Sequence, residues 1–295
     1  LNEHINSMVR IAVEFGINPI NAIQMAGINT AEYFGIKNLG AIAPGYKADL
    51  LVFNNLKDFN PEIVIKNGEI AAQYGKMITQ TEKKLPSSLR GTVNIRWIDE
   101  NDLKIKAKTD KVKAIEVTDG QLVTKTVEAK VKIQDGYAKS NIEDDVLKIL
   151  VIERHKASGN IGKGFVKGFG IKSGAIASTV AHDSHNMIVI GTNDDDMFKA
   201  IKELVKSQGG KVIVQNGEVL AKLELPVAGL MSEETAQTVI QKYLELKQGE
   251  KQIGCKLNEP FMTMSFLSLA VIPEIKLTDK GLMDVLNNEF TELFI

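Results

Sequence analysis

Cysteine is nearly absent from this sequence, in which Cys255 is the single cysteine among 295 residues. One cysteine excludes a disulfide within the chain. Proteins without disulfides are typical of reducing compartments, and we therefore expect a cytoplasmic protein.

Long hydrophobic runs are also missing. The longest apolar segment, residues 261–272, is too short for a membrane-spanning helix and contains threonine and serine. The first residues show neither the basic start nor the cleavage site of a signal peptide, and they do not begin with methionine. Because Leu1 already stands inside a helical pattern of apolar residues, we expect the chain to begin partway through a longer protein.

An excess of charge of either sign is lacking as well. Lys and Arg total 36 and Asp and Glu total 37, which leaves a net charge of -1. This balance creates no field that would attract nucleic acid or an anionic membrane, so we expect neither as a partner. The hydrophobic share of 44% and the charged share of 25% are ordinary for globular proteins, and the length favours more than one domain.

The first part of the chain, residues 1–39, predicts helices. Apolar residues recur at helical spacing until Gly16, a residue typical of helix C-termini. Asn18 followed by proline predicts the start of a second helix, and Asn29 is expected to cap a third, shorter one.

The remaining chain predicts mostly strands, with helices between them. Residues 40–85 read as a small β segment and a polar linker, with a tight hairpin turn at Asn67-Gly68. Residues 86–295 read as a mixed α/β domain. Its clearest predicted strands are residues 147–155 and 187–190. The sequence therefore predicts an α+β protein whose longest domain is C-terminal, with helices at residues 194–207 and 232–247.

A glycine-rich segment, residues 159–174, raises the question of a phosphate-binding loop. Such loops require the dinucleotide glycine fingerprint or a Gly-Lys-Ser/Thr sequence. Here Gly162-Lys163-Gly164 is followed by Phe165, so neither spacing fits. The pattern instead favours glycines that permit sharp turns around a buried strand.

A second polar segment contains two of the four histidines in the sequence AHDSHN, with His182, Asp183, His185 and Asn186 close together. Histidines three residues apart could share a metal ion with an aspartate. If the segment stays extended, however, the two rings face opposite sides of the sheet. Nothing marks Ser184 as a nucleophile on a strained turn. The alternative is a turn in which the Asp and Asn side chains bond their own backbone.

Charged residues also stand at the end of the predicted strand 147–155. Glu153, Arg154 and His155 form either a polar cluster at the edge of a site or an internal ion pair, because buried charges need partners. The sequence alone favours neither.

Three predictions concern packing. The acidic residues 194–196 are expected to form a solvated first helical turn that complements the helix dipole. Trp97, the single tryptophan, is expected in the hydrophobic core, as are Met262 and Met264.

The segment at residues 40–50, GAIAPGYKADL, with VIKNGE at 64–69, is similar to the end of amidohydrolase-superfamily enzymes. In that superfamily the corresponding segment leaves a metal-bearing (β/α)8 barrel and enters a small β-sandwich. The resemblance implies that residues 1–39 are the last helices of the barrel and that residues 40–85 are part of the β-sandwich.

The rest of the chain resembles the C-terminal domain of bacterial adenine deaminases. The matching segments are ERHKASG (153–159), GFG (168–170), GAIASTVAHDSHN (174–186), LPVAGLM (225–231) and VIPEIKLTDKGL (271–282). This resemblance implies hydrolysis of adenine to hypoxanthine and ammonia, with a divalent metal, manganese or iron, activating a water. It also implies a homo-oligomer.

The sequence departs from the family in its histidines. The family's barrel carries a His-x-His pair among its metal ligands, whereas His4, His155, His182 and His185 include no such pair. We therefore expect no metal site in this chain, and we expect the isolated chain to be inactive without the preceding barrel region.

The resemblance suggests a role for both polar segments in the whole enzyme. His182, Asp183, His185 and Asn186, with Glu153 and His155, are the candidates for residues close to the substrate. They would border the barrel mouth and contact the purine or order a loop. The alternatives are a polar contact at a domain or subunit interface, and a non-catalytic module that binds a purine or a protein.

Overall fold

In a computed structural model of the chain, residues 4–78 and 87–295 are described. The chain divides into two compact units, Leu1–Lys84 and Leu85–Ile295. The helices expected in 1–39 and the strands expected after them therefore share one unit, while the long C-terminal region forms the other.

The first unit begins with three helices, α1 (Ile5–Glu14), α2 (Pro19–Ala26) and α3 (Ile28–Tyr33). The side chain of Asn18 accepts a hydrogen bond from the N–H of Ile20, as expected for an N-cap. The prediction for the third helix was wrong in detail. Gly27 is its N-cap and makes no side-chain bond, because the turn begins before Asn29.

A four-stranded sheet completes the first unit. Its strands are β1 (Leu50–Phe53), β2 (Pro61–Lys66), β3 (Glu69–Gln73) and β4 (Lys76–Met77), in that order. Asn67 and Gly68 both have positive φ, which gives the tight turn between β2 and β3. The predicted linker falls largely on residues 79–86, which lie outside the described residues.

The second unit is built on an eight-stranded sheet with the order β15-β14-β12-β13-β10-β11-β6-β7. All neighbouring strands are antiparallel except β11 and β6. The strands are β6 (Lys111–Glu116), β7 (Lys125–Lys130), β10 (Val146–Ile152), β11 (Ile161–Lys167), β12 (Ala175–Ser178), β13 (Met187–Gly191), β14 (Gly210–Gln215) and β15 (Glu218–Glu224).

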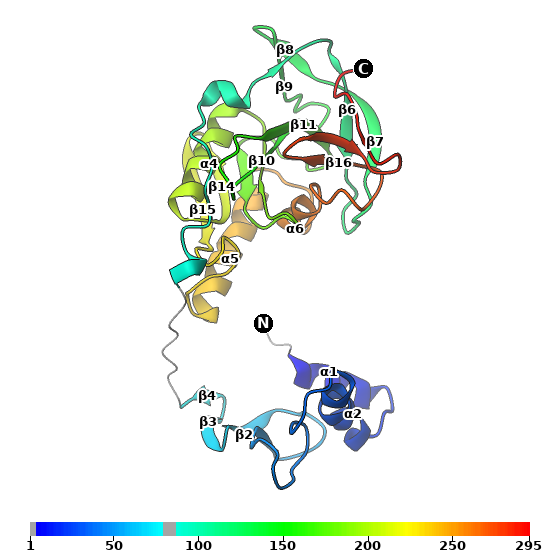
Figure 1. Ribbon diagram of the computed structural model, residues 1–295, viewed down its shortest axis with the longest axis vertical. Helices are drawn as coiled ribbons and strands as arrows, with labels where there is room; N and C mark the ends of the chain where they lie inside the picture. Colours follow the sequence, from blue (N-terminus) through cyan, green and yellow to red (C-terminus); the bar gives the residue numbers. More distant parts are fainter. Residues whose placement is uncertain (1–3, 79–86) are drawn as a thin grey trace. The chain divides into compact units, whose positions relative to one another are not determined.

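Both faces of the central strands are covered, which explains their continuous apolar sequences. On one face Leu150 and Val189 pack against α4 (Asp194–Lys206). On the other face Ile149 and Ile188 pack against a core that includes α5 (Ala236–Gln252), α6 (Pro260–Ser265) and β16 (Ile275–Thr278). Figure 1 shows α4 and α5 flanking this sheet.

Smaller elements surround the main sheet. One three-stranded sheet contains β5 (Ile105–Lys106), β9 (Tyr137–Lys139) and β8 (Lys132–Gln134), and another contains β16, β17 (Gly281–Asp284) and β18 (Glu289–Phe290). Two 3-10 helices, η1 (Ser87–Leu89) and η2 (Glu100–Leu103), precede them. Cys255 lies beyond α5, partly buried against the main core, and burial raises the pKa of its thiol to about 11.

Several packing predictions were wrong. Trp97 has 89% of its surface exposed and Met262 has 54%, whereas Met264 is fully buried as expected. The acidic turn is not simply solvated either. Asp194 is paired with Lys148 and Lys139, and Asp196 is 2% exposed and accepts the N–H of Gly217 at 2.7 Å.

No helix among residues 4–78 and 87–295 is long and apolar enough to cross a membrane. In its mixture of helices and separate sheets the structure has the α+β character that the sequence predicts.

Candidate functional site

The two polar segments singled out in the sequence lie side by side at one edge of the main sheet. β10 and β13 are antiparallel neighbours, and Ile152 at the end of β10 pairs with Met187 at the start of β13. The loop that follows β10 therefore meets the loop that precedes β13. His155 Nε2 lies 2.7 Å from the carbonyl oxygen of Ser184, which joins the two loops directly.

Glu153 organises the first of these loops. Its carboxylate accepts hydrogen bonds from the backbone N–H groups of His155, Lys156 and Ser158, and from the Ser158 hydroxyl. Burial alone would raise the pKa of this carboxyl, but the bonds from Ser158, Lys156 and His155 lower it to about 2. Glu153 is therefore a permanent anion at neutral pH, bound to its own loop, and it makes no internal ion pair with Arg154.

Arg154 turns inward, and only 1% of its surface is exposed. Its guanidinium donates to three main-chain carbonyls, those of His185, Thr92 and Ala228. Gly229 packs directly on the guanidinium, where an added Cβ would lie 2.7 Å from Nη1. Arg154 thus fastens three separate chain segments, including the histidine-containing turn.

His182 begins that turn and is anchored by α6. Its N–H donates to the carbonyl of Ser265 at 2.8 Å, and its Nδ1 lies 3.1 Å from the Ser265 hydroxyl. The ring stacks on Phe266, with centroids 4.3 Å apart and planes only 3° apart. Asp183, the next residue, is exposed. The segment is a turn, so the extended arrangement that would separate His182 from His185 does not occur.

The end of the turn leaves two buried polar atoms without partners. Among the described residues, neither Nδ1 of His185 nor Oδ1 of Asn186 has a hydrogen-bond partner. Burial, and after it the positive charge of Arg154, lower the pKa of His185, so the ring is neutral at pH 7. Buried polar atoms are normally paired, so two orphans in adjacent residues mark the turn as a site that is incomplete by itself.

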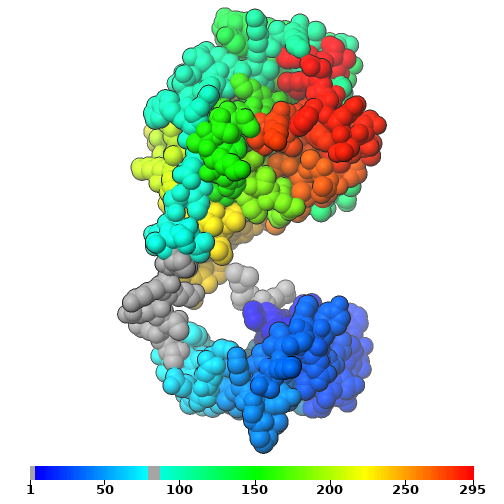
Figure 2. Space-filling model, in the orientation of Figure 1, coloured from blue at the N-terminus to red at the C-terminus, as the bar shows by residue number. Residues whose placement is uncertain are grey.

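A hollow of about 360 Å³ opens between these loops and the turn that joins β16 to β17. Figure 2 shows residues 153–160 (bright green) at the surface of the second unit, beside that turn (orange-red). The hollow brings together three of the six candidates, Glu153, His155 and Asn186, whereas His182, Asp183 and His185 lie outside its lining. The other lining residues are Lys156, Ser158, Asn160, Ser184, Asp279 and Lys280.

Sequence reasoning missed Asn160, Asp279 and Lys280 as members of this site. Asp279 and Lys280 stand within the segment VIPEIKLTDKGL, which carried part of the family resemblance. A charged pair in a turn between two apolar strands was the available signal, but nothing in the sequence connects that turn with residues 153–160.

The described side chains do not fit a metal ion. No three His, Cys, Asp or Glu residues within residues 4–78 and 87–295 gather in a way that could hold one. The rings of His182 and His185 are 6.3 Å apart, and Nδ1 of His182 is already engaged by Ser265.

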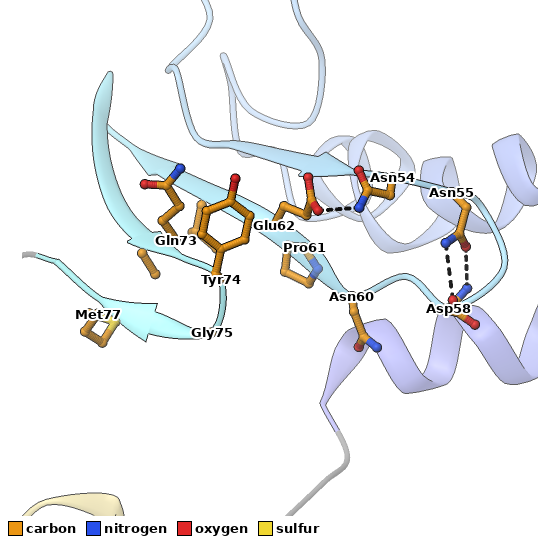
Figure 3. A pocket seen from close by; sticks show the side chains of 12 residues that line it. Asn54, Asn55, Asp58, Asn60, Pro61, Glu62, Gln73, Tyr74, Gly75 and Met77 are labelled. Carbon is orange, nitrogen blue, oxygen red and sulfur yellow. Dashed lines mark hydrogen bonds between the residues drawn. The ribbon is translucent and has the colours of Figure 1, made fainter.

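A larger hollow, of about 590 Å³, lies in the first unit beside β2 and β3 (Figure 3). Its amide and carboxylate groups bond mainly to one another. Asn54 donates to Glu62, and Asn55 donates to Asp58 and accepts that residue's own N–H. These bonds occupy four of its polar side chains, and the hollow contains neither of the polar segments singled out in the sequence, so we place the candidate site in the second unit.

Comparison with known protein families identifies the second unit. Residues 121–289 match the adenine deaminase C-terminal domain. The chain belongs to this family. All six candidate residues fall within the matched segment of the adenine deaminase C-terminal domain. Residues 2–71 match the amidohydrolase family, so both resemblances noted in the sequence are confirmed.

Curated relatives extend the comparison along nearly the whole chain. The chain is 45% identical to an adenine deaminase of Dehalococcoides mccartyi (strain CBDB1) and 45% identical to adenine deaminase 2 of Carboxydothermus hydrogenoformans, each over 95% of its length. It is 44% identical to an adenine deaminase of Thermosipho melanesiensis over 99% of its length. It covers 49%, 50% and 50% of these relatives, so it spans about half the length of the curated relatives that it matches.

Proposed function

We propose that this chain is the C-terminal part of an adenine deaminase, which hydrolyses adenine to hypoxanthine and ammonia. The match of residues 121–289 to the family's C-terminal domain carries this proposal. The match of residues 2–71 to the amidohydrolase family supports it.

The metal chemistry belongs to a part of the enzyme that this chain does not cover. A manganese or iron ion would lower the pKa of a water and supply the hydroxide that attacks the amino-bearing carbon. The described residues here contain no ligand set for such an ion. We therefore propose that the half of the relatives outside the matched region supplies the metal, and that the isolated chain is inactive.

Exposed apolar side chains on the first unit support the proposal that another part of the enzyme covers them. Met8 and Tyr33 on its helices, and Phe15 and Phe34 at the helix C-termini, are all more than half exposed, and soluble proteins rarely leave such patches uncovered. We propose that these helices are the last helices of the barrel and that they pack against the rest of the barrel in the full-length enzyme. Association into a homo-oligomer in the cytoplasm is the accompanying proposal.

The candidate site would then contribute to binding the substrate, and not to activating the water. The main chain of the His182–Asn186 turn is held from outside by Arg154 and Ser265, while Nδ1 of His185 and Oδ1 of Asn186 have no partner among residues 4–78 and 87–295. Such preorganisation is what a binding site requires. We propose that this turn and residues 153–160 contact the purine or order a loop over it.

One experiment tests the assignment of the activity. The chain is purified alone, or co-expressed with the first half of the Dehalococcoides relative, and is supplied with manganese or ferrous iron. Ammonia release from adenine is then measured. We expect no release from the chain alone and release from the pair. Turnover by the chain alone, or no turnover by a folded, associated pair, contradicts the proposal.

The role of the turn is tested in the same active pair. Asp183 is exposed, so Asp183→Ala should not disturb folding, whereas His182→Ala also removes the stack on Phe266. We expect both variants to lower the catalytic efficiency toward adenine. Unchanged efficiency in a well-folded double variant would show that the turn has only a structural or interface role.

The second candidate function is a non-catalytic module that binds a purine or a protein. The lack of a metal-ligand cluster among the described residues favours it for the isolated chain. Purine binding by the chain, without turnover by the co-expressed pair, would support this function over the first.

A further inference from the structure

The hydroxyl of Ser265 joins α6 to the ring of His182. Ser265 is 2% exposed, and its Oγ lies 2.7 Å from the carbonyl oxygen of Met262 and 3.1 Å from Nδ1 of His182. A hydroxyl carries one proton and can donate it to only one of these two atoms. A carbonyl oxygen can only accept, whereas a ring nitrogen can donate or accept. Both contacts are therefore hydrogen bonds only if Oγ donates to Met262 and accepts from an Nδ1–H group.

The opposite arrangement is less favourable. If the hydroxyl donated to Nδ1 instead, the shorter contact, with the Met262 carbonyl, would bring two acceptors together without a proton between them. The buried hydroxyl would then lose one of its two hydrogen bonds, which is costly. A neutral imidazole carries one proton, so a proton on Nδ1 leaves a lone pair on Nε2. The surroundings thus select the Nδ1–H tautomer of His182.

Nε2 of His182 is the nitrogen left for a ligand. Among residues 4–78 and 87–295 it has no hydrogen-bond partner, and unlike Nδ1 of His185 it is not one of the buried unpaired atoms. His182 also keeps part of its surface exposed. The stack on Phe266 holds the plane of the ring, and the bond to Ser265 decides which edge faces α6. A lone pair is therefore held in a fixed place at the turn.

We propose that Ser265 is a positioning residue that holds His182 in the Nδ1–H tautomer, so that Nε2 accepts an N–H group of the bound purine. The class of ligand rests on the proposed function, whereas the tautomer follows from contacts within this chain alone. A fixed acceptor suits adenine, which carries N–H donors. Ser265 itself does not touch the purine and acts only through His182.

The first test uses the 295-residue chain with 15N-labelled histidine at about pH 8.5, where histidine rings are neutral. Long-range 1H–15N spectra distinguish a ring nitrogen that carries a proton from one that does not. His182→Gln identifies the signals of His182 among those of the four histidines. We expect the proton on Nδ1. A proton on Nε2 of the folded natural chain overturns the proposal, without any variant of Ser265.

Ser265→Ala removes the acceptor of the Nδ1–H group. We expect the ratio of Nδ1–H to Nε2–H to fall about fivefold, which corresponds to one hydrogen bond. Ser268→Ala is the matched control, because the Ser268 hydroxyl donates to the main-chain carbonyl of His182 at 3.3 Å and does not bond to the ring. It should leave the ratio as in the natural chain. A purely structural role of Ser265 would lower the melting temperature of Ser265→Ala and leave the ratio unchanged, which overturns the positioning role.

The role of Nε2 is tested with adenine in the co-expressed pair. We expect Ser265→Ala to raise KM about fivefold with little change in kcat, because a contact that binds the substrate and the transition state equally is weakened. An unchanged KM in a variant whose tautomer ratio has shifted overturns the accepting role of Nε2. An inactive natural pair contradicts the proposed function and removes the purine from the proposal, while the spectra of the chain still decide whether Ser265 fixes the tautomer.

Discussion

The guanidinium of Arg154 donates its Nε–H to the main-chain carbonyl of His185, a residue 31 positions further along the chain. His185 has a positive φ of 51°, a conformation that non-glycine residues seldom adopt without support. The bond to Arg154 supplies part of that support. The buried, charged side chain of Arg154 thus stabilises the backbone conformation of the candidate site.

Arg154→Lys tests this relationship. A lysine keeps the charge but cannot reach three carbonyls at once, because it lacks the planar fork of the guanidinium. We expect a loss of about 2–4 kcal/mol in the free energy of unfolding, measured by urea denaturation. Arg96→Lys is the control, since Arg96 is about half exposed and should cost little. Equal effects of the two changes would contradict the role given to Arg154.

Glu153 gives the protein a defined sensitivity to acid. The folded-state pKa of about 2 lies below the ordinary value of 4.5. The stability that this carboxylate contributes is therefore complete above pH 4.5 and is lost as the pH falls toward 2. In an NMR titration, we expect the amide signal of Ser158 to move with an apparent pKa near 2. A midpoint near 4.5 would show that the loop bonds do not hold Glu153.

Replacing Asp196, the buried aspartate of α4, should lower the stability of the protein more than replacing its exposed neighbour Asp195. Asp196 accepts the N–H groups of Gly217 at 2.7 Å and Asn216 at 3.3 Å, which ties the β14–β15 turn to the helix. Asp196→Ala leaves these donors unpaired and should cost about 2–3 kcal/mol in urea denaturation. Asp195→Ala, on the exposed side of the same turn, should cost less than 1 kcal/mol. Similar losses would indicate a solvated turn after all.

Lys276 is fully buried, and its ammonium donates to the carbonyl of Leu122 at 3.1 Å. Burial lowers its pKa from 10.5 to about 8. Between these values the folded state binds fewer protons than the unfolded chain, so stability should rise as the pH increases from 8 to 10.5. Below pH 8 the folded protein carries the cost of a buried cation.

Lys276→Met removes that cost. We expect the variant to be more stable than the natural chain at pH 7, by roughly 1–3 kcal/mol, and to lose the rise between pH 8 and 10.5. Lys125→Met, at an exposed position on β7, is the control and should leave the pH profile unchanged. A variant that is strongly destabilised at pH 7 would mean that the bond to Leu122 outweighs the cost of burial.

Local patterns in the sequence were enough for much of the fold. The apolar runs of β10 and β13 and the Asn67-Gly68 turn were predictable, because each depends on residues that are close in sequence. Asp194 was misjudged because its partner Lys148 lies 46 positions away. Trp97 was misjudged because residue type alone does not fix burial.

The candidate site, too, was predictable only where it depends on residues that are close in sequence. The density of polar residues at 182–186 and 153–155 was visible in the sequence, and antiparallel pairing of their strands explains why they meet. Asp279 was not predictable as a member, since it lies 93 positions from Asn186 and reaches it through a separate hairpin. The partners of Arg154 are backbone carbonyls, which leave no trace in a residue pattern.

The thiol of Cys255, with its pKa near 11, reacts slowly with alkylating reagents at neutral pH, because the thiolate is the reactive form. In labelling chemistry the chain therefore behaves almost as a cysteine-free protein. A single cysteine introduced at an exposed position, such as Lys280→Cys at the rim of the hollow, could carry an environment-sensitive dye. The natural chain is thus a ready background for attaching one dye at a chosen position.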